Sequence, residues 1–173
     1  MTSTLDRTAP ETSSTPASTS LVVVGIDGSA ASEAALLFAV HEAQLRGAVL
    51  RVVTSHDLAP MTYGYAGVCD LGPMEDSLQA AGRELVAAAQ ETVRAAAASS
   101  PVVVETVVEQ GRASVVLLEA AQGAALLVVG ARGAGAFNRL MNGSTCTEVV
   151  HHAHVPVAVI PCPTAGQPAQ QTP

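Results

Sequence analysis

Five short apolar runs, rich in valine, recur along the chain and are separated by longer amphipathic segments. The runs cover residues 21–26, 49–54, 102–108, 126–129 and 155–160. Continuous runs of β-branched residues are typical of strands that are buried on both faces of a parallel sheet. The intervening residues 32–46, 75–98, 111–123 and 144–152 carry apolar side chains at helical spacing. The alternation predicts an α/β domain with right-handed crossovers and helices on both faces of a parallel sheet.

The length of 173 residues suits one domain with a full hydrophobic core. Residues 1–20 and 162–173 are dominated by small, polar and proline residues, so we expect two disordered tails around a single domain at residues 21–161. Residues 56–76 carry both tyrosines with several Gly and Pro, and the segment is too long for a simple connection. It is expected to be a lid, a specificity loop or a variable surface excursion.

Charge and composition exclude several classes of function. The net charge is −7 and all eight basic residues are arginine, which disfavours nucleic acid and acidic membrane surfaces as partners. Without lysine there is neither a P-loop nor Schiff-base chemistry. The three widely spaced cysteines indicate neither a disulfide framework nor a zinc cluster, and no apolar run has the length of a membrane span. A reducing cytoplasm is the expected setting.

The stretch from Leu126 to Ser144 leads a buried strand into a glycine-rich loop. Glycine lets backbone N–H groups approach an anion, and a helix that begins near Ser144 would direct its first amides to the same place. The plain alternative is a flexible turn followed by a capping box, Thr145 with Glu148, that only starts the helix.

Asp27 follows the first strand and precedes a Gly-Ser turn. Because the carboxyl ends of parallel strands share one edge of the sheet, Asp27 and the loop after Gly130 would together form a nucleotide cleft. The alternative is that Asp27 pins the turn and caps the next helix. The dinucleotide fingerprint Gly-x-Gly-x-x-Gly is absent from this first turn, which disfavours a nicotinamide enzyme.

Two further features lie near the end of the chain. His151, His152 and His154 are either metal ligands or, as we favour, exposed residues that place positive charge at a helix C-terminus. Pro156 is poorly compatible with a central strand, so the last strand is expected at a sheet edge, or Pro156 near that strand's start.

The spacing Gly130-x-x-Gly133, nine residues, then Gly143-Ser144 resembles the Gly-2x-Gly-9x-Gly-Ser/Thr signature of ATP-binding universal stress proteins. The resemblance extends from VVVGIDGS near residue 22 to VVHHAHVPVAVI near residue 160. It implies an open five-stranded parallel sheet of order 3-2-1-4-5, a Rossmann-like fold of the adenine nucleotide alpha hydrolase type. It also implies ATP, with or without Mg²⁺, between strands one and four.

The resemblance also implies a set of site residues. Asp27 would hold the adenine or ribose end, and the backbone around Ser55 would meet the adenine edge. The residues that would contact ribose and phosphates are Gly130, Arg132, Gly133, Gly143, Ser144 and Thr145. Ala131 stands where many relatives have Ser or Thr. Relatives commonly pair through the last strand, which implies a homodimer through Val155–Ile160.

The function implied is that of a nucleotide-dependent stress-response regulator for which ATP is a ligand more than a substrate. A slow ATPase or autophosphorylating enzyme, with Ser144 or Thr145 as acceptor, is one alternative, although the sequence offers no obvious general base. A dimeric interaction module that does not bind nucleotide is the other.

Overall fold

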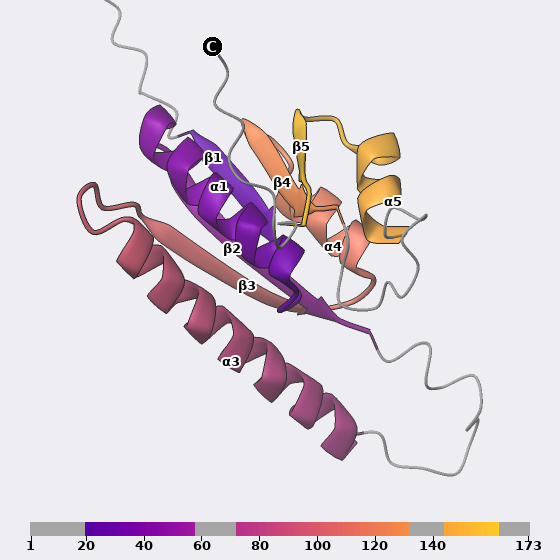
Figure 1. Ribbon diagram of the computed structural model, residues 1–173. Helices are drawn as coiled ribbons and strands as arrows, with labels where there is room; N and C mark the ends of the chain where they lie inside the picture. The colour runs from indigo at the N-terminus through magenta and orange to yellow at the C-terminus, as the bar shows by residue number, and fades with distance from the viewer. Residues whose placement is uncertain (1–19, 58–71, 132–143, 163–173) are drawn as a thin grey trace, which may run out of the picture.

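A computed structural model describes residues 20–57, 72–131 and 144–162. The strands are β1 (Leu21–Gly25), β2 (Val49–His56), β3 (Val104–Gln110), β4 (Leu126–Gly130) and β5 (Val157–Ile160), and the helices are α1 (Ala30–Arg46), α3 (Gly72–Ala96), α4 (Ala113–Ala120) and α5 (Ser144–His152). All strand pairs are parallel and form one five-stranded sheet of order β3-β2-β1-β4-β5 (Figure 1). The predicted fold and strand order are confirmed.

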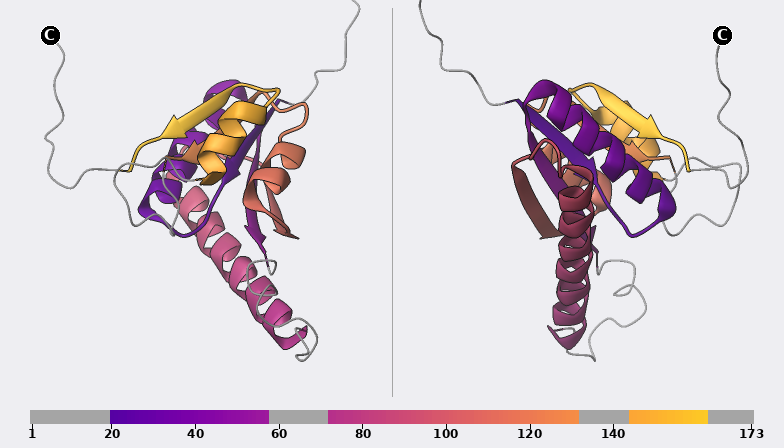
Figure 2. Two further views of the ribbon diagram at one scale, coloured as in Figure 1. Left: turned by 90° about the vertical axis from the view of Figure 1, so that its right-hand side faces the viewer. Right: turned by 60° about the vertical axis from the view of Figure 1, so that its left-hand side comes forward.

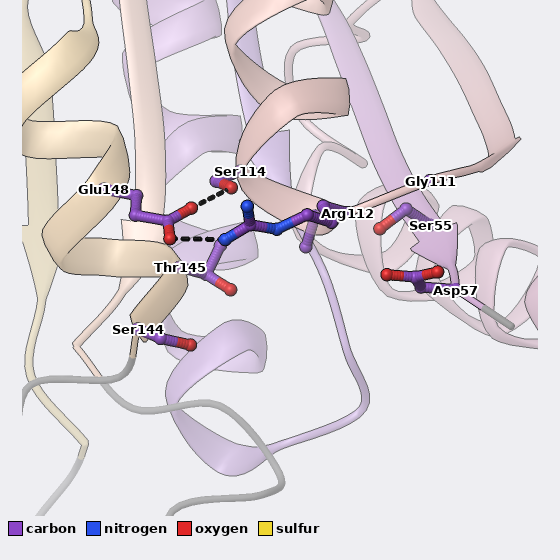
Figure 3. A pocket seen from close by; sticks show the side chains of 9 residues that line it. Ser55, Asp57, Gly111, Arg112, Ser114, Ser144, Thr145 and Glu148 are labelled. Atoms are coloured by element: carbon purple, nitrogen blue, oxygen red, sulfur yellow. Dashed lines mark hydrogen bonds and ion pairs between the residues drawn. The ribbon is translucent and has the colours of Figure 1, made fainter. Parts of the chain in front are cut away.

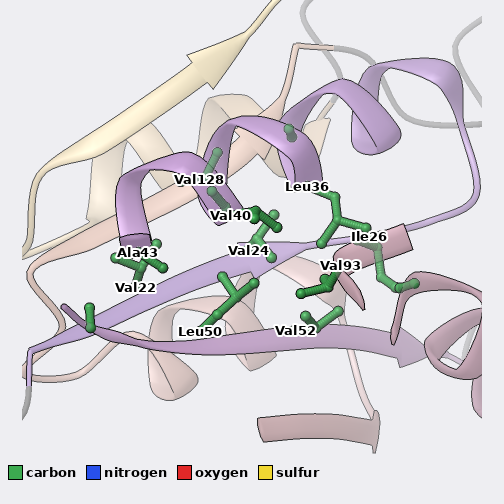
Figure 4. Close-up of a cluster of buried hydrophobic side chains, with 14 of the residues drawn as sticks. Val22, Val24, Ile26, Leu36, Val40, Ala43, Leu50, Val52, Val93 and Val128 are labelled. Atoms are coloured by element: carbon green, nitrogen blue, oxygen red, sulfur yellow. The ribbon is translucent and has the colours of Figure 1, made fainter. Parts of the chain in front are cut away.

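Alternation along the strands divides the core into two layers, one on each face of the sheet. Even-numbered β1 and β2 positions such as Val22 and Val52 pack under α1 and α3, together with Leu36, Val40 and Val93 (Figure 4). Odd-numbered positions such as Val23 and Val53 pack under α4 and α5. Because successive side chains of a strand point to opposite faces, the valine runs supply both layers at once.

Helix α1 has well-defined ends that the sequence accounts for. Ser29 is its N-cap and accepts a hydrogen bond from the Ser32 N–H at 3.2 Å. Gly47 follows the last turn in the left-handed conformation at φ 57°, where glycine carries no steric penalty. The predicted C-terminal glycine of this helix is therefore confirmed.

The long connection predicted at residues 56–76 is shorter than expected. His56 is the last residue of β2, paired with Gln110 of β3, and Gly72–Asp76 already belong to α3. Residues 58–71, like the expected tails at 1–19 and 163–173, lie outside the described residues.

The first turns of α3 extend beyond the sheet (Figure 2), and its buried residues, Val86, Ala89 and Val93, lie in its second half.

The last strand lies at an edge of the sheet, as predicted. β5 pairs with β4 alone among the described strands, and its first residue, Val157, lies beside Leu127. Pro156 directly precedes the strand and its carbonyl accepts the Leu127 N–H at 2.9 Å. The strand is therefore two residues shorter at its start than the predicted range Val155–Ile160.

Candidate functional site

A polar cavity of about 220 Å³ lies at the carboxyl ends of β2 and β3, between the first turns of α4 and α5 (Figure 3). Its lining comes from three places in the chain: the end of β2, the turn from β3 into α4, and the start of α5. The lining residues are Ser55, Asp57, Gly111, Arg112, Ala113, Ser114, Ser144, Thr145 and Glu148. This is the edge of a parallel sheet at which ligands ordinarily bind.

The end of β2 and the turn after β3 are held together by the backbone. Gly111 donates its N–H to the carbonyl of His56 at 2.8 Å and has a φ of 144°, a conformation that favours glycine. Ser55 and Asp57 lie on the α4 and α5 side of the sheet, because His56 between them takes the opposite face. The buried Nδ1 of His56 has no hydrogen-bond partner within the described ranges.

Glu148 of α5 is bound by two residues at the start of α4. The Ser114 hydroxyl donates to Oε2, and Arg112 Nη2 donates to Oε1 at 2.6 Å (Figure 3). Ser114 is buried, whereas the side chains of Arg112 and Glu148 are 64% and 36% exposed. This network joins the first turns of the two helices across one wall of the cavity.

The network sets the charge state of Glu148. The hydrogen bond from Ser114 is the largest cause and lowers the pKa of the Glu148 carboxyl below its ordinary value. Desolvation opposes this effect, whereas the charge and hydrogen bond of Arg112, and the electrostatic interaction with His152, lower the pKa further. The group is therefore a carboxylate at neutral pH. A carboxylate with a lowered pKa is a weak base, which disfavours Glu148 as a general base.

Two helix N-termini add partial positive charge to the cavity. Arg112 occupies the N-cap position of α4, but its side chain makes no capping hydrogen bond, and α5 begins at Ser144. The first amides of a helix and its dipole attract anions. Among the described lining residues Arg112 is the only cation, beside the carboxylates of Asp57 and Glu148.

Three of the predicted site residues meet in this cavity. Ser55 comes from β2, whereas Ser144 and Thr145 come from the first turn of α5, with Ser144 exposed and Thr145 half-buried. Arg132, Gly133 and Gly143 lie outside the described residues. Asp27 and Gly130 are described but do not line the cavity.

Asp27 lies in the tight turn between β1 and α1, with its side chain exposed. Its Oδ1 accepts the Ser29 N–H at 3.0 Å, and its own N–H donates to Ser32 Oγ at 3.3 Å. Asp27 thus stabilises the turn, as one of the predicted alternatives proposed. The second part of that alternative, that Asp27 caps the next helix, is wrong, because the N-cap of α1 is Ser29. An exposed carboxylate in this position is still accessible to a ligand.

Gly130 has a packing role that the sequence does not reveal. A Cβ atom built on it would lie within 3.0 Å of the backbone of Ala31 and Ser32 in α1. Glycine is therefore required where the end of β4 passes the first turn of α1.

The capping box considered as an alternative for Thr145 and Glu148 is wrong. A Thr145 N-cap would start the helix at Cys146, but the helix begins at Ser144, in agreement with the predicted range 144–152, so Thr145 lies inside its first turn. Glu148 reaches Ser114 and Arg112 of α4 instead of its own helix end.

The sequence reasoning missed the whole contribution of the turn after β3. Gly111, three residues beyond the predicted strand at 102–108 and directly after β3 in the structure, was the available signal, since a glycine at the carboxyl end of a parallel strand permits a close approach at the ligand-binding edge. Arg112 and Ser114 follow it immediately.

The histidines near the C-terminus are exposed at His151, His152 and His154. Within residues 20–57, 72–131 and 144–162, no group of three or more His, Cys, Asp or Glu side chains is placed to hold a metal ion. None of the helices in these ranges is long and apolar enough to cross a bilayer.

Comparison with known proteins identifies relatives over nearly the whole described chain. The family model described as the universal stress protein family matches residues 20–161. The universal stress protein Rv2624c of Mycobacterium tuberculosis is 38% identical over 143 residues, which cover 80% of this chain and 47% of that protein. The chain spans about half the length of the curated relatives it matches, since the matched share of those proteins is 46–47%.

Solved structures show the same fold. The universal stress protein UspA from Lactobacillus plantarum is 26% identical with a TM-score of 0.61, over 82% of this chain and 97% of that one. A crystal structure of a universal stress protein in complex with cAMP is 25% identical with a TM-score of 0.58, over 82% of this chain and 95% of that one.

Proposed function

The chain belongs to the universal stress protein family, and from this premise we propose that it binds ATP at the carboxyl edge of its sheet and acts as a nucleotide-dependent regulator of a stress response. The observation that carries the proposal is the polar cavity between α4 and α5, where Ser55, Ser144 and Thr145 come together. The related structure that contains cAMP supports an adenine nucleotide as the class of ligand.

The chemistry of the edge supports a division of roles. The hydroxyls of Ser144 and Thr145, with the first amides of α5, are suited to phosphate oxygens. In the proposal the backbone at Ser55 meets the adenine, and the exposed carboxylate of Asp27 at the end of β1 accepts hydrogen bonds from ribose hydroxyls. The nucleotide then extends toward Gly130 at the end of β4, and Arg132, Gly133 and Gly143 are proposed to complete its phosphate contacts.

ATP is proposed as a ligand that changes the protein's contacts, not as a substrate. The lowered pKa of Glu148 supports this view, because it makes one of the two carboxylates of this cavity a poor base. The exposed edge of β5 is the proposed site of pairing with a second copy of the chain, and the cytoplasm is the proposed location.

Calorimetric titration of the purified protein with ATP, with and without Mg²⁺, tests the proposal. Thr145→Val removes a hydroxyl of the cavity at nearly constant volume, and it should weaken ATP binding by about 10-fold, as expected for a lost hydrogen bond to a charged group. Thr147→Val is the matched control, since Thr147 lies on the same helix, is exposed and does not line the cavity.

Saturable binding that is weakened by Thr145→Val and retained by Thr147→Val supports the proposed site. A folded wild-type protein that binds neither ATP nor cAMP overturns the proposal. Equal losses in both variants would move the nucleotide away from this cavity.

A further inference from the structure

Arg112 extends across the cavity from the turn after β3 toward α5. Its guanidinium lies between the labelled side chains of Ser114 and Thr145, with Ser55 and Asp57 on the other side (Figure 3). It is the only cation among the described residues that line the cavity. A phosphate held by Thr145 and the first amides of α5 would therefore lie within the field of this one positive charge.

The contact that now holds the guanidinium is replaceable. It uses a single donor, Nη2, and leaves Nε and Nη1 without a hydrogen-bond partner among residues 20–57, 72–131 and 144–162. The Arg112 side chain is 64% exposed, and exposed ion pairs contribute little to stability. Glu148 also keeps its hydrogen bond from Ser114, so its carboxylate is still bound when Arg112 turns away.

An arginine in this setting suits phosphate better than a single carboxylate oxygen. The planar guanidinium offers several donors in a fork that matches two phosphate oxygens at once. A phosphate beside the α4 and α5 N-termini also gains from both helix dipoles, whereas the Glu148 carboxylate retains the hydrogen bond from Ser114 when Arg112 is displaced.

We propose that Arg112 is a further phosphate-recognising residue of the nucleotide site, and that Glu148 and the nucleotide phosphate compete for its guanidinium. The inference rests on the proposed function, because it assigns a specificity residue within the same cavity. The ion pair between Arg112 and Glu148 would then determine how strongly the protein prefers a nucleotide to the nucleoside that lacks the phosphate.

The test compares AMP with adenosine, two ligands that differ only by the phosphate, in calorimetric titrations of the full chain. Arg112→Gln should weaken AMP binding about 10-fold and leave adenosine binding unchanged, because the contact with the phosphate is the only contact with the ligand that it removes. Glu148→Gln should tighten AMP binding, because the competitor for the guanidinium loses its charge. Arg94→Gln is the matched control, since Arg94 forms a similarly exposed ion pair, with Glu91, on α3.

The outcomes separate the two proposals. Binding of AMP by the wild type, with Arg112→Gln weakening AMP and adenosine equally or affecting neither, overturns the role of Arg112 and leaves the nucleotide site standing. Absence of any nucleotide binding by the folded wild type overturns the proposed function and this inference with it. A selective loss for AMP that Arg94→Gln does not share establishes Arg112 as the phosphate contact.

Discussion

Gly130 at the end of β4 lies so close to Ala31 of α1 that a Cβ atom on the glycine would be 2.8 Å from the Ala31 carbonyl carbon. Gly130→Ala should therefore lower the free energy of unfolding by about 2 kcal/mol, because backbone atoms have to move apart to admit the methyl group. Urea denaturation of both proteins measures this difference.

Gly25 provides the control for that substitution. It ends the neighbouring strand β1, but a Cβ atom there would meet the methyl groups of Leu117 at 3.0 Å, and a side chain can move. Gly25→Ala should cost at most about 1 kcal/mol. If the two variants lose equal stability, the close approach of β4 to α1 is not what requires glycine at residue 130.

Arg51 joins three elements, and its loss should destabilise the protein more than the loss of its carboxylate partner. It donates through Nε and Nη2 to Glu105 on β3, at 3.0 and 2.8 Å, and through Nη1 to the Ala120 carbonyl at the end of α4, at 2.9 Å. Arg51→Met should cost about 1–2 kcal/mol of unfolding free energy, since it removes all these bonds.

Glu105→Gln is expected to cost less than about 1 kcal/mol, because the bond from Arg51 to α4 survives and an exposed ion pair is weak. Thermal or urea unfolding of the two single variants and the double variant gives the comparison. Equal losses in the two single variants would show that the contact with α4 contributes nothing.

The stability of the protein should depend on the ionisation of Glu148. Because the folded pKa lies below the ordinary value of 4.5, the charged carboxylate stabilises the fold above about pH 4.5, and this contribution is lost as the pH falls through the lower folded pKa. Ser114→Ala should raise the pKa of Glu148 toward 4.5, because the Ser114 hydrogen bond is the largest cause of the shift.

An NMR titration of the Glu148 carboxyl carbon in the two proteins tests this prediction. Ser77→Ala is the control, since the Ser77 hydroxyl bonds to the Pro73 carbonyl on α3 and lies outside the network. A Glu148 titration that is the same with and without the Ser114 hydroxyl contradicts the assigned cause.

The proposed dimer can be tested at the exposed edge of β5. Val159 is 38% exposed, whereas Val157 packs against the core beneath α4 and α5 and is unsuitable for a charged replacement. Val159→Arg should convert a dimer to a monomer in light scattering, because a buried charge at a pairing edge is costly.

Val103→Arg is the control for β5, since Val103 is exposed next to β3 at the opposite edge of the sheet. It should leave the dimer intact. A Val159→Arg protein that is still dimeric would exclude pairing through this part of β5.

The fold was predictable because its signals are local. The five valine-rich runs each overlap one of the five strands, and Gly47 ends helix α1 because of its own backbone conformation. The strand ends were predicted wrongly where the strand residues are polar. Ser55 and His56 continue β2 because they pair with Glu109 and Gln110 of β3, and this pairing cannot be recognised from the local sequence.

The site was predictable only in part, because its network depends on packing between helices. Ser114 and Arg112 are 34 and 36 residues from Glu148 in sequence, and they meet only because α4 and α5 cover the same face of the sheet. The three-residue spacing from Thr145 suggested that Glu148 capped its own helix. Glu148 instead contacts α4, and a contact between two helices cannot be predicted from the residues next to it in sequence.

The two helices that bound the cavity are much shorter than those on the other face. α4 and α5 contain 8 and 9 residues, against 17 and 25 in α1 and α3. Helices of fewer than about 12 residues are marginal by themselves and depend on packing. Amide hydrogens of α4 and α5 should therefore exchange with solvent through partial openings that leave β1 and α1 closed. A molecule bound between the two short helices would slow that exchange. Its binding would therefore be detected on the face of the domain whose amide hydrogens are least protected in the free protein.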